Sequence, residues 1–241
     1  RDPRGSGRGR PPHVSDRVTC VIPAYRAGRT LARVVRPLRD ALPGARVVVI
    51  DDGSPDDTAV IADAVADFTI RLPENRGKGA ALRAGFACAL RFDEEIVLTL
   101  DADGQHDPSY APLLLAALDG YDVVIGQRAR SGSSMPLRRR MTNAMASVAI
   151  ARLAGIRLTD TQSGFRAIRR RVLECVDARG DRYEFETDFL IRAGRAGFRV
   201  RNAAIPTLYG APSHFRSLRD SARIVQTIWA HRRSSVEGQA S

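Results

Sequence analysis

The repeated alternation of short strand-like runs with longer amphipathic segments constrains the fold of this chain more than any other feature. The strand-like runs occur at residues 18–23, 46–52, 68–72, 96–100 and 123–126. Segments with a helical pattern follow them, at residues 30–42, 55–66, 79–90 and 108–118. Strands that are apolar throughout and alternate with helices predict a mostly parallel central sheet with helices on both faces. We therefore expect a single domain of the α/β class.

The pattern changes after residue 128. We expect a long helix, a short strand, a helix, a strand and a last helix, at residues 135–153, 160–168, 186–196, 198–205 and 217–233. One face of the last helix is apolar and predicts packing against the core, with contact to a membrane surface as the alternative; its members are Leu218, Ala222, Val225 and Trp229. The Gly/Pro-rich basic leader 1–16 and the tail 234–241 are expected to be disordered, so the folded domain spans 17–233.

Two aspartates, Asp101 and Asp103, stand at the end of the buried run 96–100. Side chains along a strand alternate between its faces, so both carboxylates project to the same side where the sheet stops. Carboxylates held this close repel each other, and a divalent cation relieves that repulsion. Gly104 lets the backbone turn, and Gln105 adds a neutral oxygen. The pair predicts a metal site, with an acidic turn at a strand end as the alternative.

Polar or turn-forming residues follow four of the predicted strands. They are Pro23–Tyr25, Asp51–Ser54, Asp101–Gln105 and Gly126–Arg128. In sheets of this kind, ligands bind at the carboxyl ends of the strands. We therefore expect these segments to form one site at one edge of the sheet.

The net charge of +11 is large for a chain of 241 residues. Basic surfaces bind nucleic acid, anionic membranes or phosphorylated small molecules. No nucleic-acid-binding motif is present, and aromatic residues do not interleave the basic clusters, so we expect no nucleic-acid partner. The three cysteines are far apart and lie in apolar runs, which predicts buried, reduced thiols in a cytosolic protein.

Six motifs, taken in order, resemble one family. They are VIPAY (21–25), VIDDGSPDDT (49–58), NRGKGAALRAG (75–85), LDADGQHDP (100–108), VVIGQR (123–128) and DTQSGFR (160–166). Together they are similar to the family 2 inverting glycosyltransferases of the GT-A fold. Within that family they most resemble the dolichol- and polyprenol-phosphate mannose or glucose synthases. The resemblance covers about residues 18–220 of the chain.

The resemblance implies a Rossmann-like GT-A domain in which residues 17–128 bind the nucleotide sugar and residues 129–233 bind the acceptor. It assigns the donor to Pro23, Ala24, Tyr25, Asp51, Asp52, Arg76, Gly77, Lys78, Asp101, Ala102 and Asp103. It assigns Mg²⁺ or Mn²⁺ to Asp101, Asp103 and Gln105, against the donor diphosphate. It assigns the acceptor phosphate to Arg128, Arg138, Arg139, Arg140, Arg166 and Arg216, and catalysis to Asp103 and Arg128.

The implied reaction is metal-dependent, inverting transfer of a hexose from a GDP-mannose or UDP-glucose type of donor to polyprenol or dolichol phosphate. Peripheral contact with the inner face of the cytoplasmic membrane follows from that acceptor. A lipid phosphate is already ionised at neutral pH and needs no general base. The alternative is a soluble family 2 enzyme acting on a hydroxyl of a small molecule or glycan, with Asp188 or Glu186 as the catalytic base. An acidic surface helix is the other interpretation of that segment.

Overall fold

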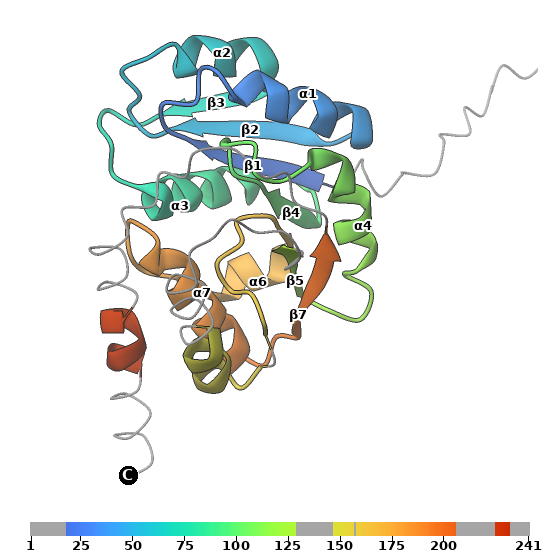
Figure 1. Ribbon diagram of the computed structural model, residues 1–241, viewed down its shortest axis with the longest axis vertical. Helices are drawn as coiled ribbons and strands as arrows, with labels where there is room; N and C mark the ends of the chain where they lie inside the picture. Colours follow the sequence, from blue (N-terminus) through green and yellow to red (C-terminus); the bar gives the residue numbers. More distant parts are fainter. Residues whose placement is uncertain (1–17, 129–146, 157, 206–224, 232–241) are drawn as a thin grey trace, which may run out of the picture.

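A computed structural model describes residues 18–128, 147–156, 158–205 and 225–231 (Figure 1). Its centre is a seven-stranded sheet with the strand order β3-β2-β1-β4-β6-β5-β7. The strands are β1 (Val18–Ala24), β2 (Arg46–Asp51), β3 (Phe68–Arg71), β4 (Ile96–Thr99), β5 (Val123–Arg128), β6 (Arg166–Arg169) and β7 (Val200–Ile205). All neighbouring strands are parallel except β6, which runs antiparallel to both β4 and β5. The predicted single α/β domain with a mostly parallel sheet is confirmed.

Helices cover both faces of the sheet. They are α1 (Leu31–Ala41), α2 (Thr58–Val65), α3 (Lys78–Ala89), α4 (Ala111–Ala116), α6 (Arg170–Cys175) and α7 (Glu184–Arg195). Residues 147–154 and 225–231 are also helical, and a 3₁₀ turn, η2 (Pro108–Tyr110), precedes α4. Figure 1 shows α1 and α2 on one side of β1 and β2, and α3 on the other side.

Side chains of the central strands alternate between two apolar layers. In β2, Val47 and Val49 belong to the layer that includes α1 and α4, whereas Val48 and Ile50 belong to the layer that includes α3 and α7. All four side chains are buried. A strand that contributes to two cores must be apolar at every position, which is why the sequence shows continuous runs instead of alternation.

The antiparallel direction of β6 determines what stands at each edge of the sheet. Its first residue, Arg166, pairs with Thr99 at the carboxyl end of β4, and its last residue, Arg169, pairs with Ile96 at the amino end. The loop that precedes β6 therefore lies at the same edge as Asp101. The residues that follow β6 lie at the opposite edge.

Several predicted boundaries differ from the structure. The helix expected at 108–118 is divided into η2 and the shorter α4, because the Asp107 carboxylate caps the 3₁₀ turn by accepting from the Ser109 N–H group. The helix expected at 186–196 begins two residues earlier, as α7. Helix α6 was not expected, since six residues are too few to establish a helical period.

Two predictions of burial were wrong. Of the three cysteines, only Cys20 is buried; Cys88 is half-buried and Cys175 is exposed. In the last helix, Val225 and Trp229 are 52% and 56% exposed, so these two side chains do not pack against the core. The core contact comes from Ile228 instead.

The other expectations for the chain ends fall on residues outside the described part. These are the leader 1–16, the tail 234–241, most of the helix expected at 135–153, and Leu218 and Ala222 of the last helix. Within the described residues, no helix is long and apolar enough to cross a membrane.

Candidate active site

The carboxyl ends of β1, β2 and β4 form an edge of the sheet, here called the rim, and Asp52 organises one side of it. Its carboxylate accepts hydrogen bonds from the N–H groups of Arg76 and Gly77, both at 2.8 Å, and from the Asn75 amide at 3.0 Å. Burial raises the pKa of the Asp52 carboxyl above its usual range, against the effect of these two N–H groups. Asp51 supports the adjacent turn by accepting from the Ser54 N–H group at 3.0 Å.

The loop held by Asp52 requires glycine where it enters α3. Gly77 adopts φ of 106°, and a Cβ atom there would lie 2.6 Å from the Asp181 carbonyl oxygen. A side chain is excluded at this position both by the backbone conformation and by the contact. The loop therefore delivers Lys78, the first residue of α3, to the rim.

A chain of four charged side chains crosses the rim. Lys78 Nζ lies 2.7 Å from Asp101 Oδ1 and 3.1 Å from Glu186 Oε2. The other oxygen of Glu186, Oε1, lies 3.1 Å from Arg166 Nη2. The side chains of Glu186 and Arg166 are only 6% and 4% exposed. Charges of opposite sign thus alternate from β4 through α3 and α7 to β6.

The alternation of charge keeps the Lys78 amine and the Asp101 carboxyl in their charged forms. Burial alone would lower the pKa of the Lys78 amine, but the carboxylates of Asp101 and Glu186 outweigh it and raise that pKa above the ordinary value. Burial would likewise raise the pKa of the Asp101 carboxyl, and Lys78 outweighs it and lowers that pKa. Both groups therefore stay charged at neutral pH. Lys78 is also the only lysine in the chain.

The loop that precedes β6 packs directly on Asp101. A Cβ atom on Gly164 would lie 2.3 Å from Asp101 Oδ2, so the loop approaches the carboxylate with bare backbone. The Thr99 hydroxyl donates to the Gly164 carbonyl at 2.7 Å and holds this approach. His106 Nε2 lies 3.3 Å from Ser163 Oγ, which links the loop after β4 to the same segment. The motif DTQSGFR drew attention to this segment, but the sequence did not indicate the role of Gly164.

The predicted metal ligands are close in sequence, and their carboxylates have different partners. Asp101 pairs with Lys78, whereas Asp103 Oδ1 accepts from the N–H group of Gln105 at 3.0 Å and forms a turn. Among the described residues, no group of three His, Cys, Asp or Glu side chains is arranged to hold a metal ion. Mg²⁺ is commonly held by one or two carboxylates together with substrate phosphates. The two aspartates fit that kind of site, in which a diphosphate supplies the remaining oxygens.

The acidic segment at the start of α7 is buried, so the interpretation as a surface helix was wrong. Glu186 faces Lys78 and Arg166, as described above. The Asp188 carboxylate lies 2.6 Å from both Arg192 Nε and His231 Nε2, and accepts from the Arg179 N–H group at 2.7 Å. Asp188 therefore connects α7 to the helical segment 225–231.

The predicted acceptor residues are only partly described. The Arg166 side chain is buried and donates to the Ser163 and Thr161 carbonyls as well as pairing with Glu186, so it supports the rim from the interior and is not placed to contact an acceptor directly. Arg128 ends β5, and its side chain lies outside the described part. The same is true of Arg138, Arg139, Arg140 and Arg216.

The fold is that of the GT-A glycosyltransferases. Glucosyl-3-phosphoglycerate synthase from Mycobacterium tuberculosis, solved with Mn²⁺, uridine diphosphate and phosphoglyceric acid, has the same fold with a TM-score of 0.71. The identity is 21%, and the match covers 89% of this chain and 78% of that chain.

The family follows from the sequence comparison. The model of glycosyl transferase family 2 matches residues 19–177, and the chain belongs to this family. The polyprenol monophosphomannose synthase of Mycolicibacterium smegmatis is 35% identical over 215 residues, which cover 82% of this chain and 80% of that protein. The undecaprenyl-phosphate mannosyltransferase of Micrococcus luteus is 35% identical over 195 residues, covering 76% and 80%. The resemblance stated from the motifs is confirmed, and the protein is a glycosyltransferase.

Proposed function

We propose that this glycosyltransferase transfers a hexose from a nucleotide sugar to polyprenol or dolichol phosphate, with inversion at the anomeric carbon and with a divalent cation. The donor is of the GDP-mannose or UDP-glucose type. The names of the two relatives at 35% identity support this acceptor class. The cation and nucleotide in the solved M. tuberculosis structure support the donor class.

The rim supplies the groups that such a donor needs. Asp101 and Asp103 would hold Mg²⁺ or Mn²⁺, with Gln105 as a further oxygen, and the cation would offset the charge that develops on the diphosphate leaving group. The turns at Pro23–Tyr25 and Asp51–Asp52 would bind the base and ribose. The loop Arg76–Lys78, fixed by Asp52, would stand beside the phosphates, since it brings two basic side chains to the amino end of α3.

The observation that carries this proposal is that both acidic side chains of α7 at the site are already paired with basic side chains. Glu186 is paired with Lys78 and Arg166, and Asp188 with Arg192 and His231. Both oxygens of each carboxylate already have a basic partner, so neither side chain is placed to take a proton from a hydroxyl. An acceptor that arrives already ionised avoids this need, and phosphate is such an acceptor. Arginines such as Arg128, Arg138–Arg140 and Arg216 would position it.

The acceptor implies a membrane, and the helical segment 225–231 offers a contact. Val225 and Trp229 are one turn apart on this segment and both are exposed. Exposed tryptophan and aliphatic side chains on a helix suit the boundary of a bilayer. We place the enzyme at the inner face of the cytoplasmic membrane, held by peripheral contact.

A donor screen tests the proposal. Purified protein is incubated with labelled GDP-mannose or UDP-glucose, polyprenyl phosphate, and Mg²⁺ or Mn²⁺. We expect label in the lipid phase, loss of transfer with a chelator, and a decrease of roughly 100-fold or more in Asp103→Asn. Asp119→Asn, the same change at an exposed position outside the rim, should retain full transfer. Label that enters only water-soluble products would contradict the lipid acceptor.

The hydroxyl alternative has its own test. If Asp188 were the base, Asp188→Asn would lower the turnover number by several orders of magnitude with a hydroxyl acceptor. Under the phosphate proposal the same variant retains most of its turnover at neutral pH. Its pH–rate profile should also keep the shape of the unmodified enzyme's profile.

A further inference from the structure

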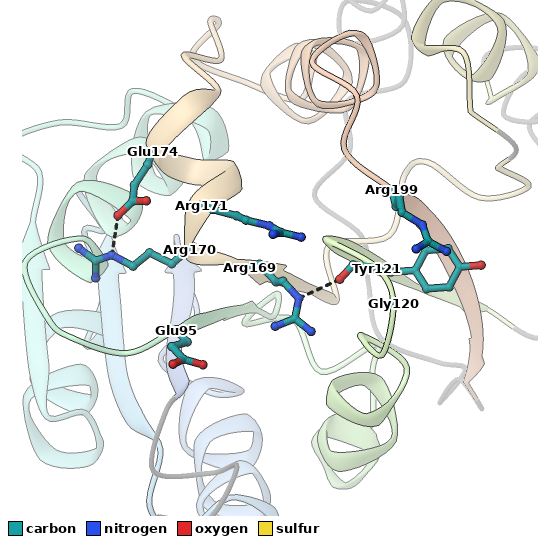
Figure 2. A pocket seen from close by; sticks show the side chains of 8 residues that line it. All are labelled: Glu95, Gly120, Tyr121, Arg169, Arg170, Arg171, Glu174 and Arg199. Atoms are coloured by element: carbon teal, nitrogen blue, oxygen red, sulfur yellow. Dashed lines mark hydrogen bonds and ion pairs between the residues drawn. The ribbon is translucent and has the colours of Figure 1, made fainter.

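A cavity lined by several charged residues lies at the opposite edge of the sheet from the rim. Its volume is about 560 Å³, within the range of small-molecule sites. Figure 2 shows the residues that line it: Glu95, Gly120, Tyr121, Arg169, Arg170, Arg171, Glu174 and Arg199. None of them belongs to the donor or acceptor assignments made above.

The sheet topology explains why arginines meet there. Strand β6 ends at Arg169, beside the amino end of β4, and α6 follows without a loop. The amino ends of β5 and β7 are neighbours in the same sheet, so Tyr121 and Arg199 stand next to that point. The Asp122 carboxylate joins these segments by accepting from the Arg199 N–H group at 2.8 Å and from the Arg171 side chain.

The lining carries an excess of positive charge, with four arginines against two glutamates. Two of the arginines are fixed chiefly by carbonyl groups. Arg169 donates to the Tyr121 and Leu118 carbonyls, at 2.9 and 3.2 Å, and Arg170 to the Leu90 carbonyl at 2.7 Å. A carbonyl orients a guanidinium without cancelling its charge, in contrast to the carboxylate of Glu174, which pairs with Arg170. The positive potential is therefore held in a fixed geometry.

Arg199 is the most available of the four cations. Its guanidinium stacks on the Tyr121 ring at 5.0 Å, and within the described part of the chain it has no carboxylate or carbonyl partner. Arg201 packs over the same ring at 4.9 Å. Arg171 is paired with Asp122, yet its side chain is 65% exposed, so part of its guanidinium group faces solvent. In Figure 2, Arg171 and Arg199 approach the Tyr121 side of the cavity from different elements.

We propose that this cavity is a second ligand site, which binds the phosphate group of an anionic ligand. Arginine forks match phosphate oxygens in geometry and charge, and the fixed guanidinium groups reduce the ordering cost of binding. The phosphate belongs either to a free phosphorylated compound or to an anionic lipid headgroup. This site is independent of the proposed transfer reaction, because it uses other residues at the other edge of the sheet.

Inorganic phosphate is the probe, titrated calorimetrically into the full chain without metal or donor. We expect Arg199→Gln to weaken phosphate binding by roughly fivefold. Glu174→Gln removes a competing carboxylate and should tighten binding by roughly twofold. Arg36→Gln, the same change as the first variant at an exposed position on α1, should have no effect. Because the two cavity variants act in opposite directions, partial unfolding cannot imitate the pattern.

Phosphate can also bind at the rim, so the difference between variants is the quantity that decides. Equal affinities in all four proteins would overturn the proposal. A second arm measures sedimentation with phosphatidylcholine vesicles that contain phosphatidylglycerol. If Arg199→Gln lowers vesicle binding more than Arg36→Gln does, the ligand is a lipid headgroup; if only the phosphate titration changes, the ligand is a free compound.

Discussion

Lys78 brings a compact cation between two carboxylates where three elements meet. An ammonium group can face Asp101 and Glu186 at once, whereas an arginine fork would need more room and a planar partner. The rim therefore depends on a pair of contacts that only a lysine of this reach makes. Removing the cation would leave two carboxylates in a poorly solvated place.

Replacement of Lys78 by Met should destabilise the fold substantially. The expected loss is about 3 kcal/mol in the free energy of unfolding, because breaking a buried ion pair from one side leaves uncompensated charge. Urea denaturation measures it as a lower midpoint with an unchanged slope. Arg33→Met, at an exposed position on α1, is the control and should change the midpoint little. A stability of Lys78→Met equal to that of the control would contradict the buried ion-pair chain.

Substitution of Gly164 tests the contact between the β6 loop and Asp101. Gly164→Ala should cost about 1–3 kcal/mol of stability and also lower transfer, since the new Cβ atom must displace the carboxylate. Gly85→Ala is the matched control, because its Cβ atom would meet Val21 at 2.4 Å in the core, away from the rim. At a temperature where both variants are folded, only Gly164→Ala should lose activity. Equal losses would show that the contact matters for packing alone.

The cysteines should differ sharply in reactivity. Burial raises the pKa of the Cys20 thiol to about 12, so it stays protonated and inaccessible well above neutral pH. A disulfide-exchange reagent at pH 8 should modify the exposed Cys175 first, Cys88 more slowly, and Cys20 only after denaturation. Cys175→Ser should remove the fast phase. Rapid modification of Cys20 in the native protein would mean that the apolar layer between the sheet and α1 unfolds locally and often.

At the scale of elements, α7 links the rim to the segment 225–231. Glu186 and Asp188 are two positions apart on this helix, and they face Lys78 and His231 respectively. Arg195 adds to the second contact by donating to the His231 carbonyl at 2.9 Å. The attachment of the segment thus depends on a few polar contacts and on Ile228.

His231→Ala should loosen the segment without unfolding the domain. Amide hydrogen exchange of residues 225–231 should become roughly tenfold faster, because one charge-assisted contact of about 1.5 kcal/mol is lost. Exchange in β1 and β2 should stay unchanged. Gln226→Ala, at an exposed position of the same segment, is the control. No difference between the two variants would mean that the apolar contact alone holds the segment.

Elements with a strong apolar pattern could be predicted from the sequence, and those governed by tertiary contacts could not. Strands β1, β2 and β4 were located by their apolar runs, since each is buried on both faces. The position of β6 between β4 and β5 carries no local signal, because its direction depends on which neighbours it pairs with. Val225 and Trp229 were expected in the core, since an apolar stripe looks the same whether it packs inward or faces outward.

The candidate site was predicted in its residues more than in its contacts. The sequence argument placed Asp101 and Asp103 on one face by strand alternation, whereas β4 ends at Thr99 and Asp103 lies in the turn that follows. The partners of Asp101 come from α3 and from the β6 loop, 23 and 63 positions away (101 − 78 and 164 − 101), and no spacing rule connects them. The same holds for the burial of Glu186, which depends on where α7 packs.

At the scale of the whole molecule, the exposed pair on the segment 225–231 should govern membrane contact. The double variant Val225→Ser, Trp229→Ser should reduce sedimentation with anionic vesicles by roughly tenfold, since burying these side chains in the boundary supplies a few kcal/mol. Val60→Ser is the control, because Val60 is 66% exposed on α2. Undiminished vesicle binding in the double variant would place the contact elsewhere on the molecule.

Because the chain has a single lysine, Lys78 can serve as a spectroscopic probe of the candidate active site. Expression with ¹³C,¹⁵N-lysine would label one residue, so a spectrum would contain side-chain signals from Lys78 alone. The Lys78 amine lies between Asp101 and Glu186, and its signals would shift when a donor or a cation arrives at the rim. Ligand screening for this enzyme could therefore proceed by observing one residue, before any substrate has been turned over.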